Sequence, residues 1–177
     1  NVVLGSYSYM IKNLGDEGFG QELLIDSEIA TDNLIINQQG RLSNRDGYRF
    51  TSTAGSSHFD FYNSAYRSIY FANLAINNIN KLDPSTRRDN IEGEALFIRA
   101  LNHLELLRNY AKIPTQSSDA LSSLGVAYLT TADASVRPSR KTVQECYDLV
   151  LADLLASRAK IGTSNPQGRA SLAAVNT

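Results

Sequence analysis

The sequence predicts an all-α protein built of helical hairpins joined by long loops, and three observations support this fold class. Apolar residues recur at steps of three and four along residues 57–82, 85–110 and 142–161. This spacing places them on one stripe of an α-helix. Only two to four residues separate the first two segments, which favours an antiparallel helical hairpin. No part of the chain has the pattern of a β-rich domain.

The first long helix is predicted over about residues 57–82. Ser57 followed by Asp60 forms a plausible N-terminal cap, and Asp83 with Pro84 ends the pattern, because the residue before proline disfavours helical geometry. The expected buried stripe consists of Tyr62, Tyr66, Ile69, Asn73, Ile76 and Ile79. Tyr70 shares the helical spacing of the tyrosines, and Tyr62, Tyr66 and Tyr70 are all expected in the core.

A second helix is predicted from Ser85 or Thr86 to about Tyr110, and a third follows Thr142. Thr142 with Glu145 forms a capping-box signature at the start of the third helix, and Gly162 suits a left-handed C-cap at its end. Residues 170–175 read as the start of a fourth helix. Tandem pairs of this length resemble tetratricopeptide units in layout, without a strict sequence repeat.

Residues 111–140 lose the helical period and accumulate proline, serine and glycine, so a long loop with at most short helical turns is expected. A loop of this length suggests a functional or partner-facing segment, and a packed connector is an equally good interpretation.

The N-terminal third is less regular. A short helix is expected to begin near Val3 and end near Gly15. Residues 22–33 fit either a helix or irregular structure, and residues 38–57 fit a loop or a small hairpin.

The length of 177 residues suits one domain, 1–177, and the net charge of −1 makes nucleic acid an improbable partner. The single cysteine, Cys146, excludes a disulfide scaffold. No apolar run reaches the roughly 20 residues of a membrane-spanning helix. The chain opens without Met and stops within an expected helix, so we expect it to be a fragment of a longer protein.

Catalytic and metal-binding patterns are lacking in the sequence. The two histidines, His58 and His103, have no partners at metal-ligand spacing, and His103 is expected to be structural. The acidic group Asp26, Glu28 and Asp32 lacks the calcium-loop pattern, so capping or solvated roles are expected. The charges of the second helix, including Glu92, Glu94, Arg99 and Arg108, are interpreted as structural ion pairs. We therefore expect no enzyme activity, no metal site and no cofactor.

Eight aromatic residues gather between positions 48 and 71. An aromatic ring can stack on the apolar face of a sugar while neighbouring groups bind its hydroxyls. Tyr48, Phe50 and Phe59 lie in or beside the polar segment before the first long helix, where their rings could be exposed. These three residues are the candidate glycan contacts.

An ordered set of motifs resembles the SusD-like (RagB/SusD) family. Residues 62–73, continuing to Ile76 and Ile79, resemble its signature helix, although Tyr62 replaces a tryptophan. Residues 93–100, with the sequence GEALFIRA, resemble its most specific motif. Further along, the similar elements are Tyr110 to Pro114 with Ala111 replacing glycine, Gly125 to Ala127 with Ala127 replacing proline, Arg137 to Leu154, and Gly168-Arg169 with Ala173-Ala174.

The resemblance implies the tetratricopeptide-like N-terminal part of a nutrient-binding outer-membrane lipoprotein. Members of this family capture oligosaccharides or other nutrients at the cell surface, and they act with a SusC-like TonB-dependent transporter. Their lipid anchor, an N-terminal cysteine, is absent from this chain. A non-catalytic glycan-binding protein is therefore the leading expectation, and a helical protein–protein interaction scaffold without a small-molecule site is the alternative.

Overall fold

The computed structural model describes residues 2–11, 19, 23–29, 31, 33–37, 39–40, 45–51, 53 and 61–177. These residues form seven α-helices and no strand, and they include one isolated β-bridge between Leu124 and Thr142. The all-α prediction is confirmed. The chain divides into two compact units, one formed by residues 1–7 and 66–177 and the other by residues 8–65.

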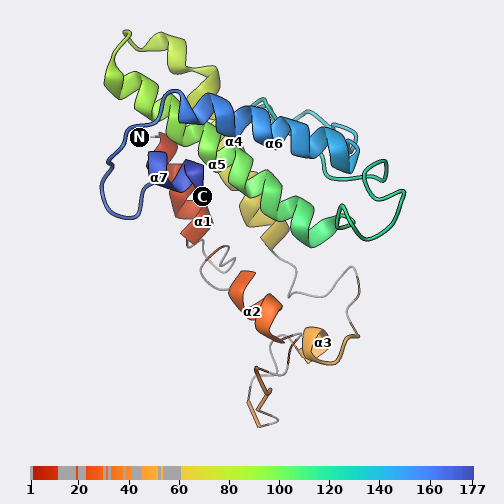
Figure 1. Ribbon diagram of the computed structural model, residues 1–177. Helices are drawn as coiled ribbons and strands as arrows, with labels where there is room; N and C mark the ends of the chain where they lie inside the picture. Colours follow the sequence, from red (N-terminus) through yellow and green to blue (C-terminus); the bar gives the residue numbers. More distant parts are fainter. Residues whose placement is uncertain are drawn as a thin grey trace. The chain divides into compact units, whose positions relative to one another are not determined.

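The first unit is built around the hairpin of α4 (Phe61–Asn77) and α5 (Thr86–Tyr110), shown in Figure 1. The two helices are joined by the 3-10 turn η3 (Ile79–Lys81), and Ser85 caps α5 by accepting a hydrogen bond from the Arg88 amide at 3.2 Å. Small and branched side chains allow close packing: Ile69 and Ala72 of α4, and Ala95 and Ile98 of α5, are fully buried. The predicted hairpin is confirmed.

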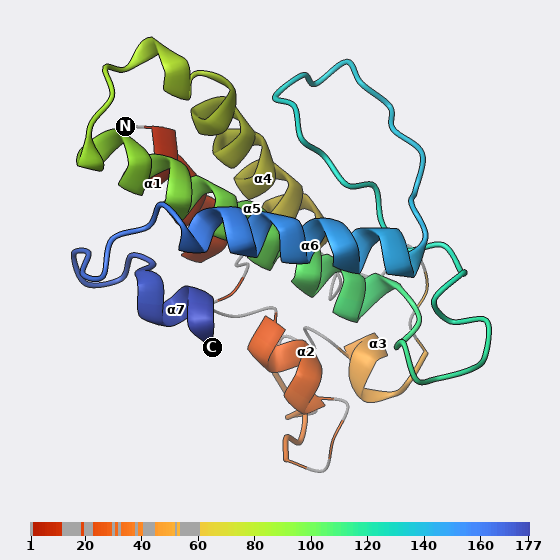
Figure 2. The ribbon, with the colours of Figure 1, turned by 45° about the horizontal axis from the view of Figure 1, so that its top comes forward.

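Helix α6 (Val143–Arg158) packs along α5, as Figures 1 and 2 show. Its predicted capping box is present, because the Thr142 hydroxyl accepts from the Glu145 amide and the Glu145 carboxylate accepts from the Thr142 amide. Near the C-terminal end of α6, the Ser157 hydroxyl donates to the carbonyl of Gly93 on α5 at 2.7 Å. The sequence of α5 therefore brings its backbone against α6 at a glycine.

Two further helices, α7 and α1, pack against these long helices. Helix α7 (Leu172–Asn176) contacts α6, and α1 (Val2–Ile11) meets α4, where the Ser68 hydroxyl donates to the Ser6 carbonyl at 3.1 Å. The helical pairs in series have the tetratricopeptide-like layout that the sequence predicts. The predicted end of the first helix near Gly15 lies outside the described residues.

The prediction that Gly162 is a left-handed C-cap is wrong. Helix α6 ends with Ala159 in the right-handed region, and Gly168 is the described glycine with a positive φ, at 81°. The Gly162 amide instead donates to the Asn90 side chain at 2.6 Å. The backbone N–H of Gly162 is therefore satisfied by a side chain of α5 and not by a C-cap of α6.

The second unit contains α2 (Leu23–Ile29) and α3 (Arg45–Tyr48), which contact each other. Residues 22–33 therefore include a helix, one of the two expected alternatives. The expected loop or small hairpin over residues 38–57 instead contains the single helical turn α3. The predicted cap residues Ser57 and Asp60 lie outside the described residues.

The long segment between α5 and α6 is packed at a few positions and exposed at the others. Ala120, Val126 and Tyr128 are buried, whereas residues 133–141 are exposed. Two backbone hydrogen bonds hold the two ends of the segment 125–141 together. The Gly125 amide donates to the Lys141 carbonyl at 2.7 Å, and the Lys141 amide donates to the Val126 carbonyl at 3.1 Å. The loop is therefore a packed connector in part, and a functional or partner-facing role for it stays a prediction.

Within the described part of the chain, no helix is long and apolar enough to cross a membrane.

The contact of Gly93 with α6 gives a test of the fold. A Cβ at position 93 would lie 2.6 Å from the Ile161 nitrogen and 2.8 Å from its Cα. Because these are backbone atoms, Gly93→Ala should push α5 away from the segment that follows α6. We expect it to lower the free energy of unfolding by about 1–3 kcal/mol, despite the better helix propensity of alanine. Urea denaturation followed by circular dichroism measures this change.

Gly5→Ala is the matched control, because its Cβ would meet only the Phe71 ring, at 3.3 Å or more. A stability of Gly93→Ala equal to or above that of Gly5→Ala would contradict the close packing of the two helices.

Candidate functional site

The two described aromatic candidates lie in one tight turn, residues 45–51, which we call the aromatic turn. After α3, the Phe50 amide donates to the Gly47 carbonyl at 3.1 Å and the Thr51 amide to the Asp46 carbonyl at 2.9 Å. This pair of bonds is the Schellman pattern that closes a helix. The pattern requires a left-handed residue at position 50, and Phe50 occupies it with a φ of 54°.

Phe50 is an uncommon residue for this position, where glycine is usual. A left-handed conformation costs a side chain other than glycine about 1–2 kcal/mol, because Cβ crowds the following carbonyl. The ring recovers little of this by burial, since 77% of Phe50 is exposed. A strained and exposed aromatic residue is an observation that points toward function rather than packing.

Tyr48 differs from Phe50 in its environment. It is half-buried at the end of α3, and so shows less of its ring to solvent than Phe50 does. The third candidate, Phe59, lies outside the described residues. The structure therefore places Tyr48 and Phe50 in one turn and leaves Phe50 as the more accessible ring.

Arg45 and Arg49 belong to the aromatic turn, on either side of Tyr48, and are both exposed. Their guanidinium groups are hydrogen-bond donors that suit hydroxyl oxygens, whereas the ring of Phe50 suits an apolar sugar face. Sequence reasoning missed these arginines. Their positions on either side of Tyr48 were the available signal, but a helical turn had to be known before they could be placed around one site.

The expectation that Tyr62, Tyr66 and Tyr70 are core residues is wrong for two of them. Tyr62 is 46% exposed and Tyr70 is 37% exposed. Tyr66 is half-buried, and its hydroxyl donates to the Ala127 carbonyl at 2.9 Å. A strict step of four drifts around a helix of 3.6 residues per turn. The predicted Ile69 and Asn73 are fully buried, and on α4 they are joined by Phe61, Ala65 and Ala72.

No cluster of three potential metal ligands occurs among the described residues, which do not include the side chain of Asp26. Glu28 accepts a hydrogen bond from the Asn33 side chain at 2.6 Å, and its carbonyl accepts from the Thr31 hydroxyl at 2.7 Å. Glu28 therefore organises the end of its own helix. Asp32 lies outside the described residues.

The GEALFIRA segment has two charged residues, and each is engaged internally. Glu94 is fully buried and accepts two hydrogen bonds from Arg169, at 2.9 and 2.6 Å, and one from the Tyr7 hydroxyl at 2.9 Å. Burial and the nearby carboxylate raise the pKa of Tyr7 well above its usual range. Glu94 thus connects the start of the chain, α5 and the segment before α7.

Arg99 forms the second internal cluster. It donates to both oxygens of Asp153 on α6 at 2.6 Å and to the Asn73 side chain on α4 at 3.0 Å. Asn73 in turn donates to the Leu129 carbonyl, and the Tyr128 hydroxyl donates to Asp153 at 2.7 Å. Burial beside this carboxylate raises the pKa of Tyr128. One cluster therefore joins three helices to the loop.

His103 is fully buried and is a structural residue, as predicted. One ring nitrogen lies 2.9 Å from the Arg99 carbonyl, and the other accepts from the Leu129 amide at 3.1 Å. These partners require the neutral ring with its proton on Nδ1. Burial lowers the pKa of His103 to about 4, and its ring stacks on Tyr128 at 3.8 Å between centroids.

The charged side chains of the GEALFIRA segment therefore pair with other residues of the fold. Their hydrogen-bonding capacity is directed inward, and they hold the helices and the loop together. The predicted interpretation of Glu94 and Arg99 as structural ion pairs is confirmed. The aromatic turn, by contrast, presents exposed groups to solvent and is the candidate contact surface for a glycan.

Comparison with known proteins is consistent with this fold. A family model of SusD-like proteins, described as "Starch-binding associating with outer membrane", matches residues 9–175. No curated protein matches the chain.

Among solved structures, a SusD superfamily protein from Bacteroides thetaiotaomicron is 23% identical, with a TM-score of 0.78 over 98% of this chain and 39% of its own. A SusD-like carbohydrate binding protein from Bacteroides vulgatus is 20% identical, with a TM-score of 0.80 over 98% of this chain and 38% of its own. The surface glycan-binding protein A from Bacteroides uniformis is 15% identical, with a TM-score of 0.76 over 98% and 38%. The chain thus spans about two fifths of the length of these structures.

The ion pair between Arg99 and Asp153 should make a large contribution to stability. Asp153→Asn leaves the buried guanidinium without its counter-charge, and we expect a loss of about 3–5 kcal/mol in the free energy of unfolding. The double variant Arg99→Met, Asp153→Leu should lose less than the single variant, because it leaves no buried charge. Urea denaturation measures both.

The exposed pair Lys112–Asp119, 2.8 Å apart, is the control, and Asp119→Asn should leave the denaturation midpoint unchanged. Equal midpoints for Asp119→Asn and Asp153→Asn would contradict the assigned role of the buried pair.

The neutral state of His103 predicts a pH dependence. Its pKa is about 4 in the folded protein against 6.5 in an unfolded chain, so the unfolded state binds the proton first as pH falls. The stabilisation is complete above pH 6.5 and should decrease between pH 6.5 and 4 by up to about 3 kcal/mol.

Unfolding curves of the native protein and His103→Gln at several pH values test this. The glutamine carbonyl can still accept from the Leu129 amide, but it does not titrate. Between pH 6.5 and 4 the stability of His103→Gln should depend less on pH than that of the native protein. Identical slopes would contradict the buried neutral histidine.

Proposed function

The chain belongs to the SusD-like family, described as starch-binding and associated with the outer membrane, and on this basis we propose that it is a non-catalytic glycan-binding protein of the cell surface. The observation that carries the proposal is the family match over residues 9–175. We further propose that residues 1–177 form one N-terminal helical domain of a longer protein. The share of the solved structures that it covers, 39% and 38%, supports a longer protein.

We propose that the aromatic turn contributes to the glycan site. Phe50 would stack on the apolar face of a sugar, Tyr48 would support it from the end of α3, and Arg45 and Arg49 would donate to hydroxyls. The exposure of Phe50 and its strained backbone support this role. Phe59 remains a candidate contact.

A SusC-like TonB-dependent transporter is the proposed partner, and a lipid anchor in the full-length protein is the proposed membrane attachment. The family description, which names association with the outer membrane, supports this location. In this proposal the helical unit acts as a rigid support, because the ion pairs Arg99–Asp153 and Arg169–Glu94 hold its parts together.

One observation favours the alternative function of a helical interaction scaffold. Leu151 and Leu155 lie one turn apart on α6, and each is 56% exposed. A pair of exposed leucines on one helix face is suited to a second protein surface. Binding of a protein partner that depends on this pair, without any glycan binding, would favour the scaffold.

Variants of Phe50 test the glycan site. Phe50→Ala removes the ring but keeps a Cβ in the left-handed conformation, whereas Phe50→Gly removes both. We expect both to weaken binding about tenfold, the effect of losing roughly 1.4 kcal/mol of ring contact. Phe50→Gly alone should also gain about 1 kcal/mol in stability, because the strain is relieved.

A glycan array with the native protein identifies the ligand, starting with maltoheptaose as a starch fragment, and calorimetric titration then compares the variants. Tyr70→Ala is the control, since Tyr70 is an exposed aromatic residue of α4 and is not part of the aromatic turn. Native-like glycan affinity in both Phe50 variants would exclude the aromatic turn as a contact, and the absence of any bound glycan would contradict the proposed function itself.

A further inference from the structure

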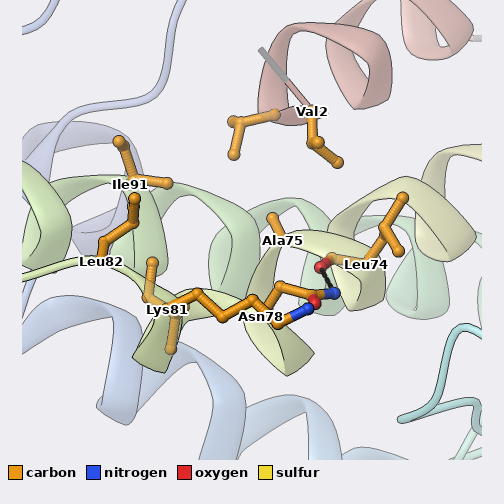
Figure 3. A pocket seen from close by; sticks show the side chains of 9 residues that line it. Val2, Leu74, Ala75, Asn78, Lys81, Leu82 and Ile91 are labelled. Atoms are coloured by element: carbon orange, nitrogen blue, oxygen red, sulfur yellow. Dashed lines mark hydrogen bonds between the residues drawn. The ribbon is translucent and has the colours of Figure 1, made fainter.

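A cavity of about 350 Å³ lies within the first unit, where three helices meet (Figure 3). The start of α1 forms one wall, the end of α4 with η3 forms another, and the start of α5 closes the third. The volume falls at the lower end of the range of about 300–1,000 Å³ typical of small-molecule pockets. We call it the aliphatic pocket.

Aliphatic side chains form most of the walls of the aliphatic pocket. Val2 faces Leu74 and Ala75 across the cavity, and Leu82 and Ile91 close one end, as Figure 3 shows. None of the described residues that line it is aromatic or acidic. A sugar ring would find neither a stacking surface nor carboxylate acceptors here, so the pocket is chemically different from the aromatic turn.

Two polar side chains lie on the same side of the pocket, Asn78 and Lys81 (Figure 3). The Asn78 amide nitrogen is already used, since it donates to the Leu74 carbonyl at 2.9 Å. Lys81 is exposed and forms no ion pair with the described residues, in contrast to Lys112 and Lys160. The pocket thus combines an apolar interior with a single uncompensated positive charge.

This combination of groups selects a ligand with two parts. An aliphatic chain gains free energy by leaving water for the walls, and a negative head group gains by pairing with the Lys81 ammonium. A cationic head would be repelled, and a neutral polar ligand would leave the apolar walls poorly covered. We propose that the aliphatic pocket binds a free alkyl carboxylate, with its chain between α1, α4 and α5 and its carboxylate at Lys81.

This proposal does not depend on glycan binding. The two sites differ in their residues, in their unit of the chain and in the chemistry of their ligands. If the Phe50 variants left glycan binding unchanged, the proposal of a carboxylate site would still stand. If octanoate did not bind, the proposed glycan site would still stand.

Calorimetric titration with sodium octanoate, below its micelle concentration, tests the site. We expect saturable binding of one octanoate per protein. Hexanoate should bind about 15-fold more weakly, because each buried methylene contributes about 0.8 kcal/mol of transfer free energy, close to a fourfold change in affinity. Octylamine, with the same chain and a positive head, should not bind.

Two variants locate the ligand. Lys81→Gln should weaken octanoate binding about tenfold and abolish the discrimination against octylamine, while Lys141→Gln, which removes an exposed lysine elsewhere, should change neither. Val2→Trp should block the chain site from the rim, where Val2 is 39% exposed, and circular dichroism verifies that both variants are folded.

Several results would overturn the proposal. They are the absence of saturable octanoate binding, equal affinities of Lys81→Gln and the native protein, and undiminished binding in Val2→Trp. Binding to phosphatidylglycerol vesicles without binding of monomeric octanoate would assign the surface to a membrane instead. A self-association that Val2→Trp abolishes, again without octanoate binding, would assign it to a second copy of the chain.

Discussion

The Arg99 guanidinium and the Asp153 carboxylate meet inside the helical unit with two hydrogen bonds of 2.6 Å. A buried charge is costly unless its partner and its remaining hydrogen bonds are supplied, so the surroundings must fit this pair. Asn73 supplies an acceptor from α4, and Tyr128 supplies a donor from the loop. The relative positions of α4, α5, α6 and the loop backbone therefore follow from the geometry of one ion pair.

The same logic explains why Glu94 and Arg99 occur together on α5. Five residues rotate a helix by about 140° from the first side chain, so the two point to different neighbours. Glu94 contacts Tyr7 and Arg169, whereas Arg99 contacts α4 and α6. The motif that identifies the family is thus a structural one. Ligand contacts are more easily placed on turns outside it, because a turn can change without disturbing the buried charges.

Sequence reasoning predicted the helices well where the pattern was local. The capping box of Thr142 and Glu145, the start of α5 at Thr86 and the hairpin all depend on neighbouring residues. It failed where a tertiary contact decided the outcome. Tyr62 and Tyr70 fit a helical spacing but lie beside the buried stripe, and Gly162 is held by Asn90 instead of forming a cap. Of the candidate site, the sequence proposed Phe50 but not its left-handed backbone.

By itself the sequence determined the all-α class, the positions of the long helices and the family, because periodicity, caps and ordered motifs are properties of the chain. Only the tertiary structure decided what the buried charges contact, which loop residues are buried and which tyrosines face solvent. It also assembled the aliphatic pocket, because it brought Val2 together with Leu82 and Ile91, which lie far from Val2 in the sequence. Such contacts depend on how helices pack, and packing joins side chains whose separation no local pattern encodes.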